Sequence, residues 1–520
     1  MVSAPVTPAV PAQRPAPAGA GPVPDPVPGS PLAAIAAEPA AVQDRLLAEH
    51  TDAVADHMAN HFGRQAPHLA ASSGFARWQR AAGAAAAAGA VAAAVVVPAV
   101  LAVALAVVIA AITAANLVIA VAARSRRRGA AGGGQPAPVP DGGLPPYTIL
   151  VPAYQEQDVI GGMVRCLEAL DYPKDRLEAL ILVERRDHAT KAAIAAAGPA
   201  DFIRVVEIPP GSPQTKPRSC NAGLLLAKGD LIVIYDAEDR PDPGQLRHVA
   251  AQFAADPDGT LACVQAKLMV ANAGASFITR QFALEYCLRY ELTLPGLARL
   301  GLPIPLGGTS NHFRTHLLRQ AGGWDAWNVT EDADLGMRCS ALGYRVEVAD
   351  SVTYGEMPHK IGAWTKQRTR WLKGFMLTAL VHTRNPARTW RTFGTAGTIT
   401  MLIFMAGTPL LYLAQSLSLA IWASGYHGLA ARGLPVGWTL TIIQTAIFAA
   451  WTALVAAAAR RHKMASAVFA PMLPAYWVMH WAASWRGLYQ LIRAPFTWEK
   501  TAHAAAHAPA PATATVTAGS

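Results

Sequence analysis

The stretch LIVIYDAED, residues 231–239, joins an apolar run of strand length to three carboxylates. Apolar runs of similar length occupy residues 148–151, 180–183 and 203–206, and helix-length stretches separate them. Strands that alternate with helices predict βαβ units, in which helices cover both faces of a mostly parallel sheet. Residues 147–380 are therefore expected to form an α/β domain with its ligand site at the carboxyl ends of the strands.

The acidic cluster at the end of this run predicts a cation site. Asp236, Glu238 and Asp239 would repel one another unless positive charge lay among them. Mg²⁺ or Mn²⁺ fits this composition, because one or two carboxylates and the phosphates of a substrate can hold such an ion. The alternative is an ordinary acidic loop between a strand and a helix.

Composition indicates a membrane protein. The chain has 520 residues, of which 52% are apolar and 15% are charged, against about 25% charged residues in soluble domains. Many of the basic residues behind the net charge of +10 lie beside long apolar runs, as on the cytoplasmic flanks of membrane helices. The sequence shows no zinc-finger spacing or aromatic RNA-binding motif, so no nucleic acid partner is expected. Five cysteines without a CxxC pair argue for a reducing compartment.

The first part of the chain divides into four segments. Residues 1–32 are a Pro/Ala arm that is expected to be disordered, and residues 33–79 have the spacing of small cytoplasmic helices. Residues 80–123 are long enough for a transmembrane hairpin of two helices that turns near Pro98. The alternative is a buried, alanine-rich hairpin of a soluble protein. Residues 124–146 form a linker into the α/β domain.

The last part of the chain returns to apolar stretches. Residues 392–459 predict a second transmembrane hairpin. Residues 464–494 have basic flanks and two prolines, which leaves a re-entrant, an interfacial and a spanning segment open. Residues 495–501 form a cytoplasmic loop, and residues 502–520 form a disordered tail. We therefore expect a multi-pass protein of the plasma (inner) membrane, with the α/β domain in the cytoplasm.

Four motifs resemble those of the processive family 2 glycosyltransferases, the cellulose synthase-like group with a GT-A fold. Residues 151–156 (VPAYQE) are similar to its opening strand and loop, and residues 236–238 (DAE) to its DxD motif. Residues 330–332 (TED) and 367–371 (QRTRW) are similar to its TED and QxxRW motifs. The resemblance covers residues 80–501, and it implies a GT-A domain inserted between two groups of transmembrane helices.

The resemblance implies a catalytic role for Asp332 as the general base, and a metal-ligating role for Asp236, Glu238 and Asp239. One base opposite the leaving group permits direct displacement, so an α-linked donor would give a β-linked product. The alternative for Asp332 is a cap at the start of a helix, because acids fill the turn that follows Thr330.

The donor implied by the resemblance is a nucleotide sugar, expected to be a UDP-sugar. In the segment QTKPRSCN, residues 214–221, Lys216 can neutralise the diphosphate, and the alternative is a solvated loop lysine. Glu184 and Asp187 follow the second strand, and which of the two carboxylates contacts the uracil of the donor is left open. The implied donor-binding residues are Pro152, Tyr154, Glu156, Glu184, Asp187, Lys216, Asn221 and Asp236.

The acceptor and product side is implied by the segments 306–311, 322–324 and 367–371. An indole can stack on a sugar face while a guanidinium holds the pyrophosphate, and the alternative is a Trp and Arg anchor at the membrane surface. Trp324 fits an acceptor platform and the core equally well. The implied residues are Gly308, Thr309, Ser310, Trp324, Glu331, Gln367, Arg370 and Trp371, and the gating residues are Trp498, Lys500 and Thr501.

The leading expectation is a membrane-embedded, inverting β-glycosyltransferase that elongates a polysaccharide and can pass it through its own helices. Its partners would be a nucleotide-sugar donor, a glycan or lipid-linked acceptor, the lipid bilayer and an accessory subunit. Two alternatives remain open. One is a non-processive transferase that moves a single sugar to a lipid-phosphate carrier, and the other is an inactive membrane scaffold.

Overall fold

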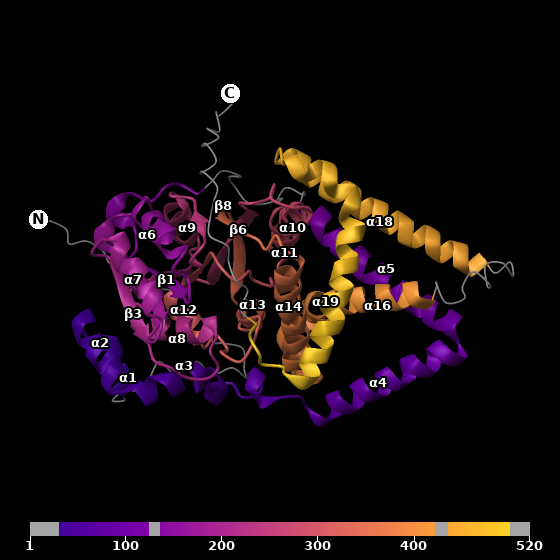
Figure 1. The fold of residues 1–520 in the computed structure, drawn as a ribbon, viewed down its shortest axis with the longest axis horizontal. Coiled ribbons are helices and arrows are strands. Elements are labelled where there is room, and N and C mark those ends of the chain that lie inside the picture. Colours follow the sequence, from indigo (N-terminus) through magenta and orange to yellow (C-terminus); the bar gives the residue numbers. More distant parts are fainter. Residues whose placement is uncertain (1–30, 124–135, 422–434, 500–520) are drawn as a thin grey trace, which may run out of the picture.

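The computed structural model describes residues 31–123, 136–421 and 435–499. Figure 1 shows an α/β body at one end of the molecule and a group of long helices at the other. The N-terminal helices α1 (Pro31–Ala37), α2 (Ala40–Glu49) and α3 (Thr51–Gln65) lie along the α/β body, and the C-terminal helix α19 (Leu473–Arg493) crosses the helical group.

One half of the central sheet is parallel. The strands β1 (Tyr147–Ala153), β2 (Leu177–Glu184), β3 (Ile203–Ile208) and β4 (Leu231–Ile234) lie in the order β3-β2-β1-β4 and pair in parallel. This confirms the four strands that the apolar runs predict. The carboxyl ends of β1 and β4 therefore lie side by side, which places residues 236–239 next to the loop after Ala153.

The other half of the sheet is mixed. The full order is β3-β2-β1-β4-β7-β6-β8-β5, where β7 (Asn311–Arg314) is antiparallel to both β4 and β6 (Leu261–Val270). β6 is parallel to β8 (Arg345–Gly355), and β5 is Arg240–Pro241. The chain leaves the end of β6, makes an excursion through α10 (Phe277–Cys287) and α11 (Leu294–Leu300), and enters β7 from the same edge. This return brings residues 307–309 to the carboxyl end of β4.

Alternate residues of each strand serve two separate cores, as the period of two in a strand requires. Ile149 and Val151 belong to the core that includes α6 (Ile160–Glu168) and α9 (Gln245–Ala254). Leu150, between them, belongs to the larger core that includes α8 (Lys216–Leu226) and α13 (Glu331–Ala341). Both faces of the sheet are thus covered by helices, and its carboxyl edge is left for ligands.

The N-terminal segment forms a helical cap on the α/β body, defined here as residues 31–74. It contains α1 (Pro31–Ala37), α2 (Ala40–Glu49) and α3 (Thr51–Gln65), so the expected small helices are present. α3 packs on α8, and Val54, Met58 and Phe62 are buried there. The cap is part of the larger core rather than a separate unit.

Three helices of the described residues are long and apolar enough to cross a membrane: Arg77–Val96, Val100–Ala122 and Pro386–Ile421. The first two belong to α4 (Arg77–Val96) and α5 (Pro98–Ala122), which meet at Val97, beside the expected turn. The third joins α15 (Pro386–Met401) to α16 (Thr408–Ile421) and is kinked at Gly394, where φ is 65°. α18 (Pro435–Arg461) follows, and the turn of the second expected hairpin lies outside the described residues.

Residues 464–494 contain a short helix, Ala465–Met472, and then α19 (Leu473–Arg493). α19 packs along α14 (Ile361–His382), the helix that carries residues 367–371 (Figure 1). A Cβ atom at Gly487 of α19 would lie 3.3 Å from the carbonyl oxygen of Thr369. This close approach fixes α19 against the motif-bearing helix and leads the chain back to residues 494–499.

Candidate active site

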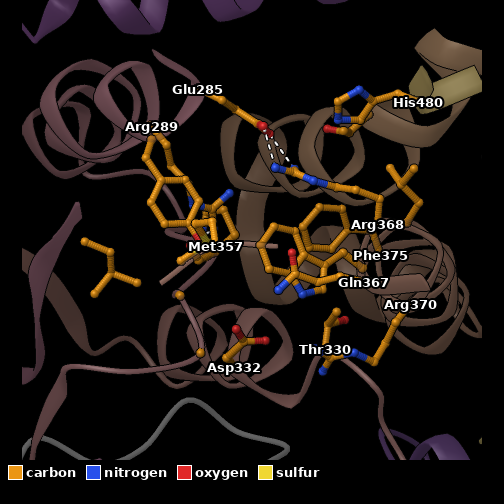
Figure 2. Close-up of a pocket in the computed structure, with 18 of the residues that line it drawn as sticks. Glu285, Arg289, Thr330, Asp332, Met357, Gln367, Arg368, Arg370, Phe375 and His480 are labelled. Atoms are coloured by element: carbon orange, nitrogen blue, oxygen red, sulfur yellow. Dashed lines mark hydrogen bonds and ion pairs between the residues drawn. The ribbon is translucent and has the colours of Figure 1, made fainter. Parts of the chain in front are cut away.

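A single cavity of about 1140 Å³ joins the carboxyl edge of the sheet to the long helices. Its walls include the loops after β1 and β4 and the starts of α8 and α13. They also include side chains of α5, α14, α16, α18 and α19. Figure 2 shows Asp332 and Arg370 at one side of this cavity and Glu285 with Arg368 at another. Charged side chains at the sheet edge and apolar side chains of the long helices therefore line the same cavity.

The acidic cluster after β4 lines the cavity. Burial raises the pKa of Glu238 to about 8, and the neighbouring carboxylate of Asp236 adds to this shift. Burial also raises the pKa of Asp239, whose carboxylate accepts hydrogen bonds from the backbone N–H of Asp236 at 2.8 Å and from the hydroxyl of Thr309. Crowded acids with raised pKa values are the electrostatic condition that a bound cation relieves.

Lys216 lies opposite these acids at the start of α8. Its Nζ atom forms an ion pair with Asp236 and donates a hydrogen bond to the carbonyl oxygen of Gly308 at 2.6 Å. Burial disfavours the charged ammonium, but the carboxylates of Asp236 and Glu331 outweigh it, so the pKa of Lys216 is raised. A permanent cation thus lies between the acidic cluster and residues 308–309.

Asp332 lies in the first turn of α13, on the cavity wall. Thr330 occupies the cap position of that helix, and the carboxylate of Asp332 accepts a hydrogen bond from the backbone N–H of the next residue, Ala333, at 2.8 Å. Burial raises the pKa of Asp332, although Ala333 N–H and the Arg289 guanidinium oppose the rise. Burial and the neighbouring Asp332 raise the pKa of Glu331 to about 8. Asp332 therefore does not cap the helix, and its carboxylate faces the cavity beside Gly308.

α14 contributes Gln367, Arg370 and Trp371 to the wall. The guanidinium of Arg370 lies over the ring of Trp498, 4.1 Å from its centroid. Lys373, one turn further along, donates hydrogen bonds to the carbonyl oxygens of Ala494 at 3.3 Å and Thr497 at 2.8 Å. The segment 494–499 is therefore held against α14 at the mouth of the charged side.

The donor-side residues divide into two groups. Pro152, Tyr154, Glu156 and Glu184 line the cavity. Asp187 lies outside its wall, at the cap of α7 (His188–Ala197), where its carboxylate accepts from the N–H of Thr190 at 3.1 Å and of Gln155 at 2.5 Å. Gln155 has a φ of 54°, so Asp187 holds the strained loop that presents its neighbours.

Three other expected residues are buried away from the cavity. Ser310 donates to the hydroxyl of Thr353 at 2.8 Å, and Trp324 is 2% exposed in the larger core. The amide of Asn221 donates to the carbonyl oxygens of Met58 at 3.0 Å and Trp324 at 2.9 Å, and accepts from the N–H of Trp324. The remaining expected residues of the donor, metal and acceptor sets do line the cavity. Lys500 and Thr501 lie outside the described residues.

A buried polar cluster on the helical side was not foreseen from the sequence. Arg368 donates two hydrogen bonds of 2.6 Å to the carboxylate of Glu285, and one of 3.0 Å to the hydroxyl of Tyr476 on α19. Its guanidinium also lies over the rings of Phe282, at 4.1 Å, and Trp371, at 4.6 Å. Figure 2 shows this pair facing the cavity. The only signal in the sequence is that Arg368 lies inside the motif at 367–371.

Arg289 is the other unforeseen cation. It lines the cavity from the helix that follows α10, and it donates to the carbonyl oxygen of Pro305 at 2.9 Å. Its charge opposes the rise in the pKa of Asp332. No pattern in the local sequence separates Arg289 from an ordinary surface arginine, since only the fold brings it near the TED segment.

Comparison with known proteins identifies the α/β body. Residues 145–374 match a family model described as "Glycosyltransferase like family 2". A probable glycosyltransferase, YdaM of Bacillus subtilis (strain 168), is 28% identical over 234 residues, which are 44% of this chain and 55% of that protein. A beta-monoglucosyldiacylglycerol synthase of Synechocystis sp. is 28% identical over 233 residues, 44% of this chain and 48% of that protein.

A probable glucomannan 4-beta-mannosyltransferase 7 of Oryza sativa subsp. japonica is 26% identical over 243 residues, 45% of this chain and 41% of that protein. The chain thus spans about half the length of the curated relatives it matches. Among solved structures, the mannosyltransferase PcManGT from Pyrobaculum calidifontis, in complex with GDP-Man and Mn²⁺, has a TM-score of 0.50 at 19% identity. That match covers 75% of this chain and 99% of that chain, and it supports the expected fold.

Proposed function

We propose, on the premise that residues 145–374 match the family model described as "Glycosyltransferase like family 2", that the chain is a membrane-embedded, inverting β-glycosyltransferase. It would transfer a sugar from a nucleotide sugar, with UDP-sugars as the first candidates, to an acceptor hydroxyl in the cavity. The observation that carries the proposal is the cavity itself, because it joins acids and cations at the sheet edge to the long helices.

The proposed reaction uses the residues on the two sides of Gly308. Asp332 accepts the proton of the acceptor hydroxyl, whose oxygen then forms a bond to the anomeric carbon of the donor sugar. The bond between that carbon and the diphosphate oxygen breaks, and the electron pair leaves with the nucleoside diphosphate. Lys216, which is buried and cationic, stabilises the negative charge of the leaving group. Attack opposite the leaving group inverts the anomeric centre.

The acidic cluster fits a divalent cation, although no three His, Cys, Asp or Glu side chains of the described residues converge as a complete ligand set. Oxygen ligands from Asp236 and from Glu238 or Asp239 would hold Mg²⁺ or Mn²⁺ together with the diphosphate. The raised pKa values of Glu238 and Asp239 support this assignment. When bound, the ion would neutralise charge that develops on the leaving diphosphate.

A growing glycan is the acceptor we favour. Gln367, Arg370 and Trp371 line the cavity between Asp332 and the long helices, so a sugar could stack on the indole while its hydroxyl faces the base. Trp498, stacked on Arg370, would close the charged side during each transfer. Translocation of the product along the helical wall, and an accessory subunit that completes it, belong to the same proposal.

A lipid acceptor is the second candidate. The far wall of the cavity consists mainly of apolar and aromatic side chains from helices long enough to meet a bilayer, such as Leu411, Phe448 and Trp477. A relative is named as a synthase of a glucosylated diacylglycerol. A lipid whose headgroup carries the attacking hydroxyl would place its chains along this wall, and transfer would then stop after one sugar.

Product analysis distinguishes the two acceptors. The purified protein, in vesicles with Mn²⁺, would be given radiolabelled UDP- and GDP-sugars, with an oligosaccharide primer or with diacylglycerol. A ladder of glycans from one donor would establish elongation, whereas a single labelled lipid would establish the second candidate. No transfer to either acceptor from any donor would contradict both.

A further inference from the structure

The helical cap, residues 31–74, touches the chain that leads to the proposed base. Phe62 of α3 packs against Gly322, where φ is 83° and a Cβ atom would lie 2.8 Å from the Phe62 ring. The guanidinium of Arg338 on α13 lies 4.3 Å from the centroid of the same ring. The cap therefore contacts both the start of segment 322–330 and the helix that follows it.

Hydrogen bonds tie the cap to this segment at three further points. The Asn221 amide joins the carbonyl oxygen of Met58 in α3 to that of Trp324. The carboxylate of Asp325 accepts from the backbone N–H of Ala71 at 2.6 Å. The indole N–H of Trp327 donates to the side-chain oxygen of Asn60 at 3.2 Å. The first link passes through Asn221 of α8, whereas the other two are direct hydrogen bonds between the cap and the segment.

The same segment contacts the closing segment 494–499. The ring of Trp327 meets the ring of Phe496 edge to face, with centroids 5.7 Å apart. On its other side the segment runs through Asn328, which accepts from the N–H of Thr330 at 3.1 Å, into Glu331 and Asp332. Trp327 therefore lies between the cap, the proposed base and the closing segment.

The cap is also continuous with the first apolar helix. The Arg384 side chain, at the end of α14, donates to the carbonyl oxygens of His68 at 3.1 Å, Ala70 at 2.9 Å and Gly74 at 2.9 Å. Trp78 at the start of α4 donates to the carbonyl oxygen of Arg384 at 3.0 Å. The cap is thereby fixed to α14 and α4 at the point where the chain enters the hairpin.

We propose that the cap positions the segment 324–332 and the closing segment 494–499, and that Asn60 in the cap and Asp325, which the backbone of the cap residue Ala71 holds, are the positioning residues. The inference rests on the proposed function, in which Asp332 is the base and residues 494–499 cover the donor. Neither positioning residue lines the cavity, so their effect on turnover passes through Trp327 and the chain that follows it. The cap is then part of the catalytic unit, although it lies outside residues 145–374.

Asn60→Leu tests the proposal because it removes the oxygen that accepts from the Trp327 indole. Asn60→Gln keeps both the side-chain oxygen and the amide N–H group that donates to Asp56 at 2.9 Å, and it is the conservative rescue. Arg45→Ala is the matched control, since it breaks only an exposed ion pair with Glu49 on the same cap. All variants are made in the full-length chain in lipid nanodiscs.

Two measurements decide the outcome. With Asn60→Leu, we expect kcat at saturating donor to fall roughly three- to tenfold, while the dissociation constant of UDP or GDP with Mn²⁺ and the unfolding midpoint stay near the wild-type values. Asn60→Gln and Arg45→Ala should keep most of the activity. Unchanged turnover in Asn60→Leu, or a loss shared equally by Asn60→Gln, would overturn the positioning role.

Hydrogen–deuterium exchange keeps the inference separate from the proposed function, because it needs no turnover. In Asn60→Leu, the backbone amides of residues 324–332 and 494–499 should exchange faster, while those of β1 and β4 keep the wild-type rate. If the wild-type protein transfers no sugar but this pattern appears, the proposed function fails and the positioning role stands. Unchanged exchange in both segments would overturn the positioning role.

Discussion

At the scale of single residues, the candidate site is a set of acids whose charges are costly. Glu238 and Asp239 crowd Asp236, Glu331 crowds Asp332, and Lys216 is the buried cation between the two groups. Such a cluster lowers the stability of the ligand-free protein. In return, it provides charges that can bind a divalent cation together with the diphosphate of a nucleotide sugar.

The fall of kcat at low pH should follow the protonation of the Asp332 carboxylate. The base must be ionised, and burial raises its pKa above the ordinary aspartate value of 3.8, so kcat should fall on acidification with an apparent pKa above that value. The measurement is kcat against pH at saturating donor. Asp175→Asn is the control, because Asp175 lies before β2, at the opposite edge of the sheet. Constant turnover down to about pH 4 would be incompatible with this role.

Metal removal should destabilise the protein most at high pH. The folded-state pKa of Glu238, about 8, lies above the ordinary glutamate value of 4.5. The folded protein therefore holds a proton that the unfolded chain releases, and its stability falls as the pH rises from 4.5 towards 8. With EDTA, the unfolding midpoint should decrease between pH 6 and pH 8, and Mn²⁺ should restore it chiefly at pH 8.

Glu238→Gln is the matched variant for this metal experiment, because it keeps the shape of the side chain and removes its charge. The dependence of the EDTA-treated protein on pH should flatten in the variant, and Mn²⁺ should raise its midpoint less. An equal Mn²⁺ effect in wild type and variant would show that the ion binds elsewhere.

Glu285→Gln should destabilise the helical side of the cavity. Arg368 is buried and uses both carboxylate oxygens of Glu285, so the substitution weakens a charged hydrogen-bond pair. We expect the free energy of unfolding to fall by about 2 kcal/mol. The measurement is thermal unfolding in detergent, with Glu49→Gln, on the exposed surface of α2, as the control. Equal midpoints for Glu285→Gln and wild type would contradict the importance of this pair.

At the scale of elements, the closing segment 494–499 is held by α19. Arg486 donates hydrogen bonds of 2.7 Å and 2.6 Å to the two carboxylate oxygens of Glu499. Glu499→Gln should loosen the segment and raise the KM for the donor roughly three- to tenfold. Arg493→Gln, an exposed cation at the end of the same helix, is the control. If donor KM is the same in Glu499→Gln and wild type, the segment does not close over the donor.

The sequence predicts the first half of the fold well, because each of β1 to β4 is a continuous apolar run. β7 has the sequence NHFR, which has no strand pattern of its own, so its antiparallel position comes from its pairing with β4 and β6. The mixed half of the sheet depends on such long-range pairing, which local periodicity does not report.

The site shows the same division. Asp236 and Asp332 are found from sequence because each follows the end or the start of a recognisable element. Asn221 and Trp324 also lie in motif-like segments, yet they bond to each other and to the cap rather than line the cavity. Arg289 and Glu285 reach the wall only through the packing of α10 and the helix after it.

At the scale of the whole molecule, the α/β body and the long helices meet at one cavity, and the cap packs beside it against the segment 322–330. Placement of the cap and the α/β body on the same side of a membrane implies that the junction of α4 and α5, at Val97, lies on the other side. Val97 is 43% exposed. In the proposed arrangement, α5 of this hairpin would supply an apolar wall of the cavity while the site stays open to soluble donors.

Cysteine labelling tests this arrangement. Cys166 is partly exposed and the other four native cysteines are buried. Cys166→Ser therefore lowers the labelling of native cysteines in the parent protein. An impermeant maleimide applied to intact spheroplasts should label Val97→Cys, and it should label Asp175→Cys only after permeabilisation. The reverse pattern, or labelling of both positions from outside, would contradict the expected topology.

The central claim is that the cavity transfers sugar with Asp332 as the base. The most direct measurement compares wild type with Asp332→Asn, by nucleoside diphosphate release and by binding of UDP and GDP with Mn²⁺. We predict that transfer falls by at least about a hundredfold, while nucleotide affinity changes less than about twofold, because Lys216 and the acidic cluster are untouched. Near-normal transfer by Asp332→Asn, beside an active wild type, would contradict the account.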